Sequence, residues 1–205
     1  MRLGLLGPAE GDLEALAHAA EFALNVAKVT KAIYLGDDAA MEDIVELWAQ
    51  SLVGEDPTDG AIWERAFEVA RSGSPEQIDE FLKAERNRLR LKALESLPAE
   101  ALRSVEMFGD RVAVLIHDKA LLDEEDIYSA TMLVYGKSDQ PMVKKIGTRW
   151  FLSPGKIGSP GGGLLVLDDE AEDIVATIYD KAGAESHRAE LQTARSAKMR
   201  VQGET

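Results

Sequence analysis

Three short polar segments of this chain each follow an apolar stretch typical of a buried strand, and they carry residues able to do chemistry. The first ends at Asp37, the second is His117-Asp118, and the third includes Lys137 and Asp139. Carboxylates and imidazoles act as general acids and bases and as ligands for metal ions. In an open α/β sheet the loops at the carboxyl ends of the strands converge on one crevice. The spacing therefore predicts that Asp37, His117 and Asp139 meet, although each alone is also ordinary turn chemistry.

Two glycine-containing segments could bind phosphate groups, and neither has the spacing that this requires. Gly4, Gly7 and Gly11 follow the first strand, but they do not form the G-x-G-x-x-G pattern of dinucleotide folds. Residues 136–138 (GKS) match the end of a P-loop, but Thr131 stands where the first glycine of that motif is needed. A dinucleotide loop is therefore a weak hypothesis, and a P-loop is excluded.

The elements that must position these groups begin with a strand, a helix and a second strand. Residues 2–7 predict a buried strand, Asp12 can cap a helix, and residues 32–35 predict the next strand. Between the strands, apolar residues recur at helical spacing at Leu13, Leu16, Ala20, Leu24 and Ala27. Such a βαβ unit implies a parallel pair with a right-handed crossover.

Residues 41–96 are predicted to be mainly helical and to form an insertion. The helices are expected at residues 41–52, at residues 61–71 and from residue 75 towards residue 97. Residues 74–77 (SPEQ) predict the start of the last helix, with serine as cap, proline at the first helical position and glutamine completing a capping box. Residues 85–92 (ERNRLRLK) form a local basic island, which is most simply a solvated helix face.

The second half of the chain is rich in strands. Short apolar segments separated by turns predict strands at residues 111–116, 130–135, 142–146, 149–152, 164–167 and 174–179. From Lys181 onward the strand pattern ends, so residues 181–205 are expected to form a C-terminal helix or a flexible tail. Parallel strands early and antiparallel strands late predict an α/β (α+β) fold. In that fold, residues 1–180 form one domain, a sandwich of two mixed sheets flanked by helices.

The composition excludes several classes of function. The chain has 205 residues, with 37 acidic residues against 23 basic ones and a net charge of −14. Such an acidic surface repels nucleic-acid backbones and anionic lipids, so neither nucleic acid nor membrane is an expected partner. There is no cysteine, no segment like a signal peptide and no apolar run long enough to span a membrane, so a cytoplasmic location is expected.

In the order of its motifs, the chain resembles the calcineurin-like metallophosphoesterases, particularly their small bacterial and archaeal phosphodiesterase branch. Residues 7–16 (GPAEGDLEAL) follow the family's S-D-T-H-G-N-L-E-A-L, and residues 35–37 (LGD) match the end of its second strand. Residues 135–141 (YGKSDQP) match Y-G-H-T-H-x-P, and residues 153–160 (SPGKIGSP) match N-P-G-S-x-G-x-P. The resemblance covers residues 1–180 and implies a four-layer αββα sandwich.

The same resemblance places the family's metal ligands, and most of them differ here. The family holds two metal ions with a D-x-H pair, the L-G-D aspartate, an asparagine and three later histidines. The D-x-H pair corresponds to Pro8 and Glu10, and the histidines of G-H-T-H correspond to Lys137 and Asp139. Proline has no ligand atom, and a protonated lysine repels a cation. The counterparts that keep a suitable side chain are Asp37, His117 and, as the nearest match to the asparagine, Asn87.

With its site degraded in this way, the chain is expected to bind no metal and to be catalytically inactive. Two-metal hydrolysis needs two cations about 3.5–4 Å apart that activate water and neutralise the phosphate. The expected role is a scaffold or regulator that binds a protein partner, by analogy with the metallophosphoesterase-like subunit of the eukaryotic retromer coat. Lys137 is expected either to replace the missing cation by pairing with Asp37 or to point to solvent. Trp48, Trp63 and Trp150 are candidate apolar contacts for a partner, although tryptophans are more often core residues, and a homo-oligomer is left open.

Two alternatives stay open at this point. A divergent phosphodiesterase or phosphatase could hold one Mn or Mg ion with oxygen-rich ligands, and His117 or Asp118 would then assist proton transfer. Its metal ligands would be Glu10, Asp37, His117 and Asp139, and its catalytic residues Asp37, Asn87 and His117. A nucleotide- or phosphate-sensing module would instead use the basic island. Its cationic residues are Arg86, Arg88, Arg90 and Lys92, which cannot all face one way on a helix.

Overall fold

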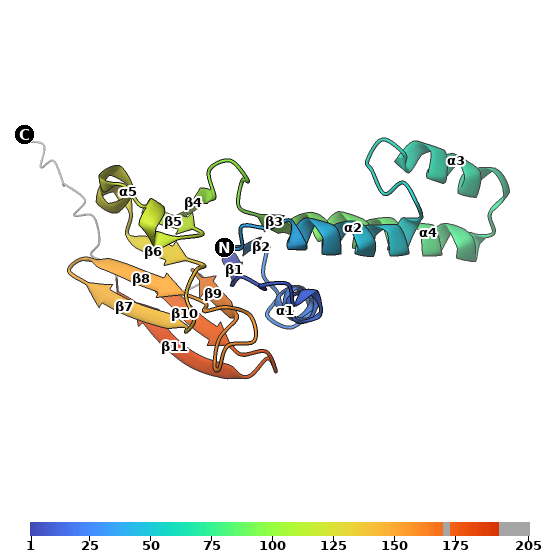
Figure 1. The fold of residues 1–205 in the computed structure, drawn as a ribbon. Coiled ribbons are helices and arrows are strands. Elements are labelled where there is room, and N and C mark those ends of the chain that lie inside the picture. Colours follow the sequence, from blue (N-terminus) through green and yellow to red (C-terminus); the bar gives the residue numbers. More distant parts are fainter. Residues whose placement is uncertain (170–172, 193–205) are drawn as a thin grey trace, which may run out of the picture.

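A computed structural model describes residues 1–169 and 173–192, and its strands form two sheets with helices outside them (Figure 1). The six-stranded sheet has the order β11-β10-β9-β1-β2-β3 and the five-stranded sheet the order β4-β5-β6-β8-β7. The strands of the first sheet are β1 Arg2–Leu6, β2 Lys31–Tyr34, β3 Leu94–Ser96, β9 Leu164–Asp168, β10 Ile174–Tyr179 and β11 Glu185–Leu191. Those of the second are β4 Arg103–Phe108, β5 Arg111–Ile116, β6 Met132–Tyr135, β7 Met142–Ile146 and β8 Arg149–Ser153.

Both sheets are mixed, as the sequence predicts. In the first sheet β1 pairs in parallel with β2 and β2 with β3, whereas β9, β10 and β11 pair antiparallel. In the second sheet β5, β6 and β8 are parallel, and β4 and β7 run antiparallel to their neighbours. The parallel strands of each sheet therefore end at a common edge, and the loops that follow them can share a site.

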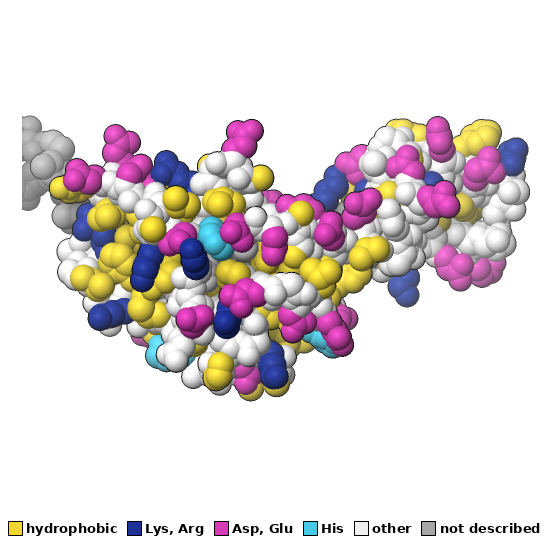
Figure 2. All heavy atoms as spheres, viewed as in Figure 1, with side chains coloured by type: hydrophobic (Ala, Val, Ile, Leu, Met, Phe, Trp, Pro, Cys, Tyr) yellow, Lys and Arg dark blue, Asp and Glu magenta, His cyan; other side chains and the backbone are white. Residues whose placement is uncertain are grey.

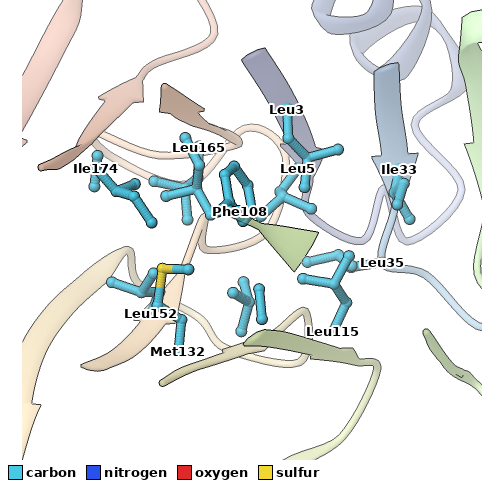
Figure 3. Close-up of a cluster of buried hydrophobic side chains, with 14 of the residues drawn as sticks. Leu3, Leu5, Ile33, Leu35, Phe108, Leu115, Met132, Leu152, Leu165 and Ile174 are labelled. Carbon is cyan, nitrogen blue, oxygen red and sulfur yellow. The ribbon is translucent and has the colours of Figure 1, made fainter. Parts of the chain in front are cut away.

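The main core lies between the two sheets (Figure 3). Alternate residues of β1 point to opposite faces, so Leu3 and Leu5 enter this core while Leu6 faces the other way. Leu115 and Met132 meet them from the second sheet. These side chains are all almost completely buried, which gives the sandwich an apolar interior independent of any polar site.

Helices cover the outer faces and complete the sandwich. Within the described residues the helices are α1 Leu13–Asn25, α2 Ala40–Val53, α3 Ile62–Ser72, α4 Pro75–Arg90 and α5 Glu124–Ser129, and 3₁₀ turns span Leu91–Ala93 and Lys119–Leu121. Asp12 caps α1 as expected, because its side chain accepts a hydrogen bond from the amide of Ala15 at 3.0 Å. Leu16 and Ala20 of α1 pack on the first sheet, and α5 lies over the second. The four-layer αββα architecture is confirmed. In the part of the chain that the structure describes, no helix has both the length and the apolar character needed to cross a membrane.

The predicted helical insertion becomes an arm. Helices α2 and α4 run side by side away from the sandwich, and α3 lies at the outer end of α4 (Figure 1). The predicted capping box is present, since Ser74 accepts from the amide of Gln77 and the Gln77 side chain accepts from the amide of Ser74. Throughout this article, "the arm" means residues 40–90.

Several expected boundaries are wrong. Helix α4 ends at Arg90, and β3 follows at Leu94–Ser96, where the sequence predicts more helix. Strand β4 and helix α5 were not predicted. From Lys181 a helix or a flexible tail is expected, but Glu185–Leu191 form β11. This strand pairs only with β10 and is mostly exposed, so it lacks the apolar alternation that marks a buried strand. Residues 193–205 lie outside the described residues.

Candidate functional site

A polar crevice lies where the loops after β1, β2, β5, β6 and β8 meet. Its volume is about 400 Å³, and it is lined by Pro8, Glu10, Asp37, Asp38, His117, Lys137, Ser138, Asp139 and Lys156. The structure thus brings together all the residues predicted for the site except Asn87. Two residues that the sequence argument did not use, Asp38 and Lys156, belong to it as well.

Backbone contacts between the loops fix the shape of this crevice. The amide of Gly7 donates to Gly163 O at 2.9 Å, and a side-chain carbon on Gly7 would lie 1.8 Å from Gly155 O. Only glycine allows this approach. The amide of Ile157 donates to Pro8 O at 2.9 Å, and that of Lys156 donates to Ser138 O at 3.0 Å. The loop after β8 is therefore tied to the loops after β1 and β6.

Tyr34 supports the crevice from below. Its side chain is fully buried, and its hydroxyl accepts a hydrogen bond from the amide of Ala9 at 3.0 Å. The same hydroxyl donates to the carboxylate of Asp38. Burial raises the pKa of Tyr34 well above its usual value, so the hydroxyl keeps its proton and can serve both partners. Tyr34 thereby links the loop after β1 to the loop after β2.

His117 is held in one orientation by the backbone. Its ring is nearly buried, and Nδ1 lies 2.8 Å from Leu35 O. A carbonyl oxygen can only accept, so Nδ1 carries the hydrogen in this bond. Nε2 then points at Asp37, with Oδ2 of Asp37 at 3.4 Å. In a neutral ring Nε2 is a hydrogen-bond acceptor, as is the carboxylate of Asp37. Their contact is favourable when a proton, a water or a cation lies between them.

Lys137 pairs with Asp118 and not with Asp37, so that expectation is wrong. Its Nζ lies 2.7 Å from Oδ2 of Asp118, and its side chain is 64% exposed. Strands β5 and β6 are parallel with Ile116 opposite Tyr135, which sets Asp118 level with Lys137, whereas Asp37 follows a strand of the other sheet. The hydrogen bond to Asp118 raises the pKa of Lys137. In turn the amide of Ala120, and then Lys137, lower the pKa of Asp118.

Lys156 is the functional candidate that the sequence argument missed. Its Nζ lies 3.2 Å from Oε2 of Glu10 and 3.4 Å from Oδ1 of Asp139. Hydrogen bonds to Glu10 and then Asp139 raise its pKa, so it stays cationic. It occupies the serine position of the matched segment 153–160, and the signal available in the sequence was a charged residue at that position. One lysine thus bridges two carboxylates from the loops after β1 and β6.

Comparison with known proteins was made on sequence and on structure. No family model matches the sequence, and no curated protein matches it. A predicted phosphoesterase from Streptococcus pneumoniae superposes with a TM-score of 0.50 at 13% identity, covering 93% of this chain and 97% of that one. The chain has the calcineurin-like metallophosphoesterase fold. At this identity the likeness establishes the fold and leaves the activity open.

Other solved structures with this metallophosphoesterase fold are also similar. An archaeal phosphodiesterase has a TM-score of 0.46 and 11% identity, covering 93% of this chain and 99% of that one. Vps29 of Entamoeba histolytica in complex with zinc has a TM-score of 0.46 and 13% identity, covering 94% of this chain and 100% of that one.

Asn87 lies away from the crevice. It is an exposed residue of α4 and lines a different hollow, together with Trp48 and Arg90. The alignment with the family's asparagine is therefore wrong, because α4 continues through this segment. At the carboxyl end of β3, next to β2, stand Leu97 and Pro98, and neither side chain can bind a metal.

The basic island is a solvated face only in part, since Arg86, Arg90 and Lys92 are exposed. Arg88 is buried, with Nε 2.7 Å from Glu85 and Nη1 2.9 Å from Asp59. Arg90 donates to the side chain of Asn25 and to a backbone carbonyl at the end of α1, and Lys92 pairs with Asp59. Most of these cations already serve intramolecular pairs, which leaves little to hold a free phosphate.

The side chains in the crevice do not fit a two-metal centre. Within the described residues, no group of three or more histidine, aspartate and glutamate side chains is placed to hold a metal ion. Asp37 and His117 face each other as two such donors. The neighbouring positions carry Pro8 and Lys137, one without a ligand atom and one with a positive charge.

Proposed function

We propose that this metallophosphoesterase-fold protein does not hydrolyse phosphoesters and acts in the cytoplasm as a scaffold or regulator that binds another protein. The observation that carries the proposal is the ammonium group of Lys156, which pairs with both Glu10 and Asp139. These two side chains stand where the family resemblance places metal-binding histidines. A fixed cation therefore takes up carboxylates that could otherwise ligate a metal.

The charge of the crevice supports the same conclusion. Its carboxylates are Glu10, Asp37, Asp38 and Asp139, with Asp118 at its side, against the two ammonium groups of Lys137 and Lys156. The excess is negative, and an anionic phosphoester entering without metal ions is repelled. The same charge favours a lysine or arginine side chain of a partner protein. The fit of the crevice is therefore better for protein binding than for hydrolysis.

The test is elemental analysis of the purified chain after incubation with Mn²⁺, Mg²⁺ or Zn²⁺, combined with an assay on a chromogenic phosphodiester. We expect no stoichiometric metal and no turnover above that of Asp37→Ala. Thermal unfolding should be the same with and without EDTA. Stoichiometric metal together with turnover that Asp37→Ala abolishes would overturn the proposal and favour the divergent phosphodiesterase.

A restored variant sharpens this test. Pro8→Asp, Glu10→His, Lys137→His and Asp139→His rebuild the ligand types of the D-x-H and G-H-T-H motifs around Asp37 and His117. We expect the variant to bind divalent metal that the natural chain does not bind. The matched control carries the same four changes with Asp37→Ala, which should weaken that binding. If the natural chain and the restored variant bind metal equally, the residues at these four positions are not what prevents metal binding.

The orientation of His117 is the observation that keeps the alternative worth testing. A histidine that donates Nδ1–H to a carbonyl and points Nε2 at a carboxylate has the ring orientation typical of a metal ligand. A single Mn or Mg ion with Asp37 and His117 is therefore the competing outcome of the elemental analysis.

A further inference from the structure

The outer part of the arm leaves several large apolar side chains exposed. None of the residues of α3 is buried, and Trp63 and Phe67 are 79% and 63% exposed. On α4, Ile78 and Leu82 are 39% and 42% exposed. Figure 2 shows hydrophobic side chains at the outer end of the arm, over α3.

These side chains lie on one side of the α3–α4 hairpin. The hollow of about 670 Å³ between α2, α3 and α4 is lined on α3 by Glu64, Arg65, Glu68 and Val69, and on α4 by Gln77, Glu80, Phe81 and Ala84. At 3.6 residues per turn, Trp63 and Phe67 fall on the opposite side of α3 from Arg65 and Val69 of the hollow. Ile78 and Leu82 likewise fall on the side of α4 away from Glu80. We call Trp63, Phe67, Ile78 and Leu82 the apolar stripe.

Helix α3 needs more burial than the single chain supplies. It has 11 residues, and isolated helices shorter than about 12–15 residues are marginal in water. In proteins such helices are stabilised mainly by packing of their apolar face. The ion pair between Arg65 and Glu85 fixes the α3–α4 register, but Trp63 and Phe67 remain uncovered. A helical hairpin with an uncovered apolar stripe is half of a four-helix bundle.

The charge distribution indicates which protein supplies the other two helices of the bundle. The chain carries a net charge of −14, but residues 62–90 hold six acidic and six basic residues, so the entire excess lies elsewhere. Two copies of so acidic a chain repel each other over most of their surfaces. The neutral hairpin is the region where copies can approach, and a two-fold contact brings the same patch of each copy together. A basic partner would bind the acidic remainder more strongly than this neutral stripe.

We propose that the apolar stripe is the interface between two copies of this chain, with α3 and α4 of each forming a four-helix bundle. The crevices of the two sandwiches then lie outside the interface. This proposal is independent of the metal-free crevice, because neither lysine of the crevice takes part in it.

Sedimentation velocity of the full chain over a range of concentrations tests it. The natural chain should reach a dimer, and Trp63→Glu with Phe67→Glu should raise the dissociation constant by more than about tenfold. Leu82→Glu should act in the same direction from the other helix. The matched control is Val105→Glu with Met107→Glu on β4, two side chains that are each 54% exposed, and it should leave the dimer unchanged. A monomeric natural chain, or a dimer that survives the stripe variants, would overturn the proposal.

A labelling experiment avoids dependence on the folding of these variants. The chain has no cysteine, so a single introduced thiol reports on its own position. Ala70→Cys lies on the side of the stripe and should react with a maleimide more slowly as the protein concentration rises. Glu68→Cys lies on the side of the hollow and should react at a constant rate. Equal behaviour of the two thiols would contradict a stripe-mediated dimer, whereas protection of Ala70→Cys alone supports it.

Discussion

The crevice and the arm both set basic side chains against carboxylates, but they do so in different surroundings. In the arm, the side chains of Arg88 and Glu85 are 5% and 6% exposed, and Arg65 forms a second ion pair with Glu85. In the crevice, the paired side chains of Lys137 and Asp118 are 64% and 23% exposed, and those of Lys156 and Asp139 are 37% and 90% exposed. Water screens the crevice pairs and scarcely reaches the arm pairs. Ion pairs therefore stabilise the fold in the arm, whereas in the crevice they are available to bind a partner.

Main-chain hydrogen bonds and the apolar core, and not ion pairs, support the crevice. The loops around it are joined by main-chain hydrogen bonds such as Gly7 to Gly163, and the sheets beneath pack through residues such as Leu5 and Leu115. The arm lacks such a core at its outer end, where α3 buries no residue. Its hairpin and the loop before α3 depend on Arg88, which also donates to Pro57 O at 2.9 Å.

The largest effect is expected from removing the centre of the arm network. Arg88→Ala leaves Glu85 buried with Arg65 alone and removes the donor to Pro57 O. Breaking a buried ion pair on one side costs about 3–5 kcal/mol, so the arm should unfold at markedly lower urea than the wild type. Circular dichroism at a helical wavelength measures this. Lys83→Ala, an exposed change on the same helix, is the control and should shift stability by less than about 0.5 kcal/mol. Equal effects of the two variants would contradict the contrast drawn between buried and exposed charges.

The next effect is expected at the base of the crevice. Tyr34→Phe removes a buried hydroxyl that accepts from the amide of Ala9 and donates to Asp38. A buried donor left without its acceptor costs about 1–3 kcal/mol, and the loss should appear as a lower unfolding free energy of the sandwich. The amide of Ala9 should also exchange its hydrogen faster, which nuclear magnetic resonance can measure. A variant as stable as the wild type would show that the crevice loops do not depend on this tyrosine.

Acid should loosen the arm before the sandwich. Burial raises the pKa of Glu85, but hydrogen bonds from Arg88 and Arg65 outweigh it, so the net pKa lies below its ordinary value of 4.5. A lowered folded-state pKa contributes stability that is present above pH 4.5 and is lost as the pH falls through the folded value. Helical dichroism should therefore fall below pH 4.5 in the wild type. In Glu85→Gln that particular pH dependence should be absent, and an unchanged acid transition would show that other carboxylates govern it.

The fold was largely predictable from the sequence, and the site only in part. The βαβ start, the capping box at Ser74 and the paired sheets follow from local patterns, because apolar period and turn residues act over a few positions. Strand β11 was missed because an exposed edge strand shows no apolar period. Residues at strand ends, such as Asp37 and His117, were correctly brought together by topology. The partner of Lys137 was not predictable, because it depends on which sheet each strand joins, and neither was the burial of Arg88.

The smallest effect on stability, and the sharpest test of the contrast, is expected from the crevice lysines. Lys137→Ala with Lys156→Ala removes both ammonium groups, whose exposed pairs contribute little to folding. The melting temperature should stay within about 2 °C of the wild type, since screened pairs do not hold the sandwich together. The same change leaves Glu10, Asp37 and Asp139 uncompensated, so the affinity of the crevice for Mn²⁺ should rise, as measured by calorimetry. Lys144→Ala with Lys145→Ala on β7, both exposed and outside the crevice, gives the same loss of charge and should not raise it. A large loss of stability without any gain in metal affinity would mean that the lysines act as they would in the arm, and the distinction between the two regions would fail.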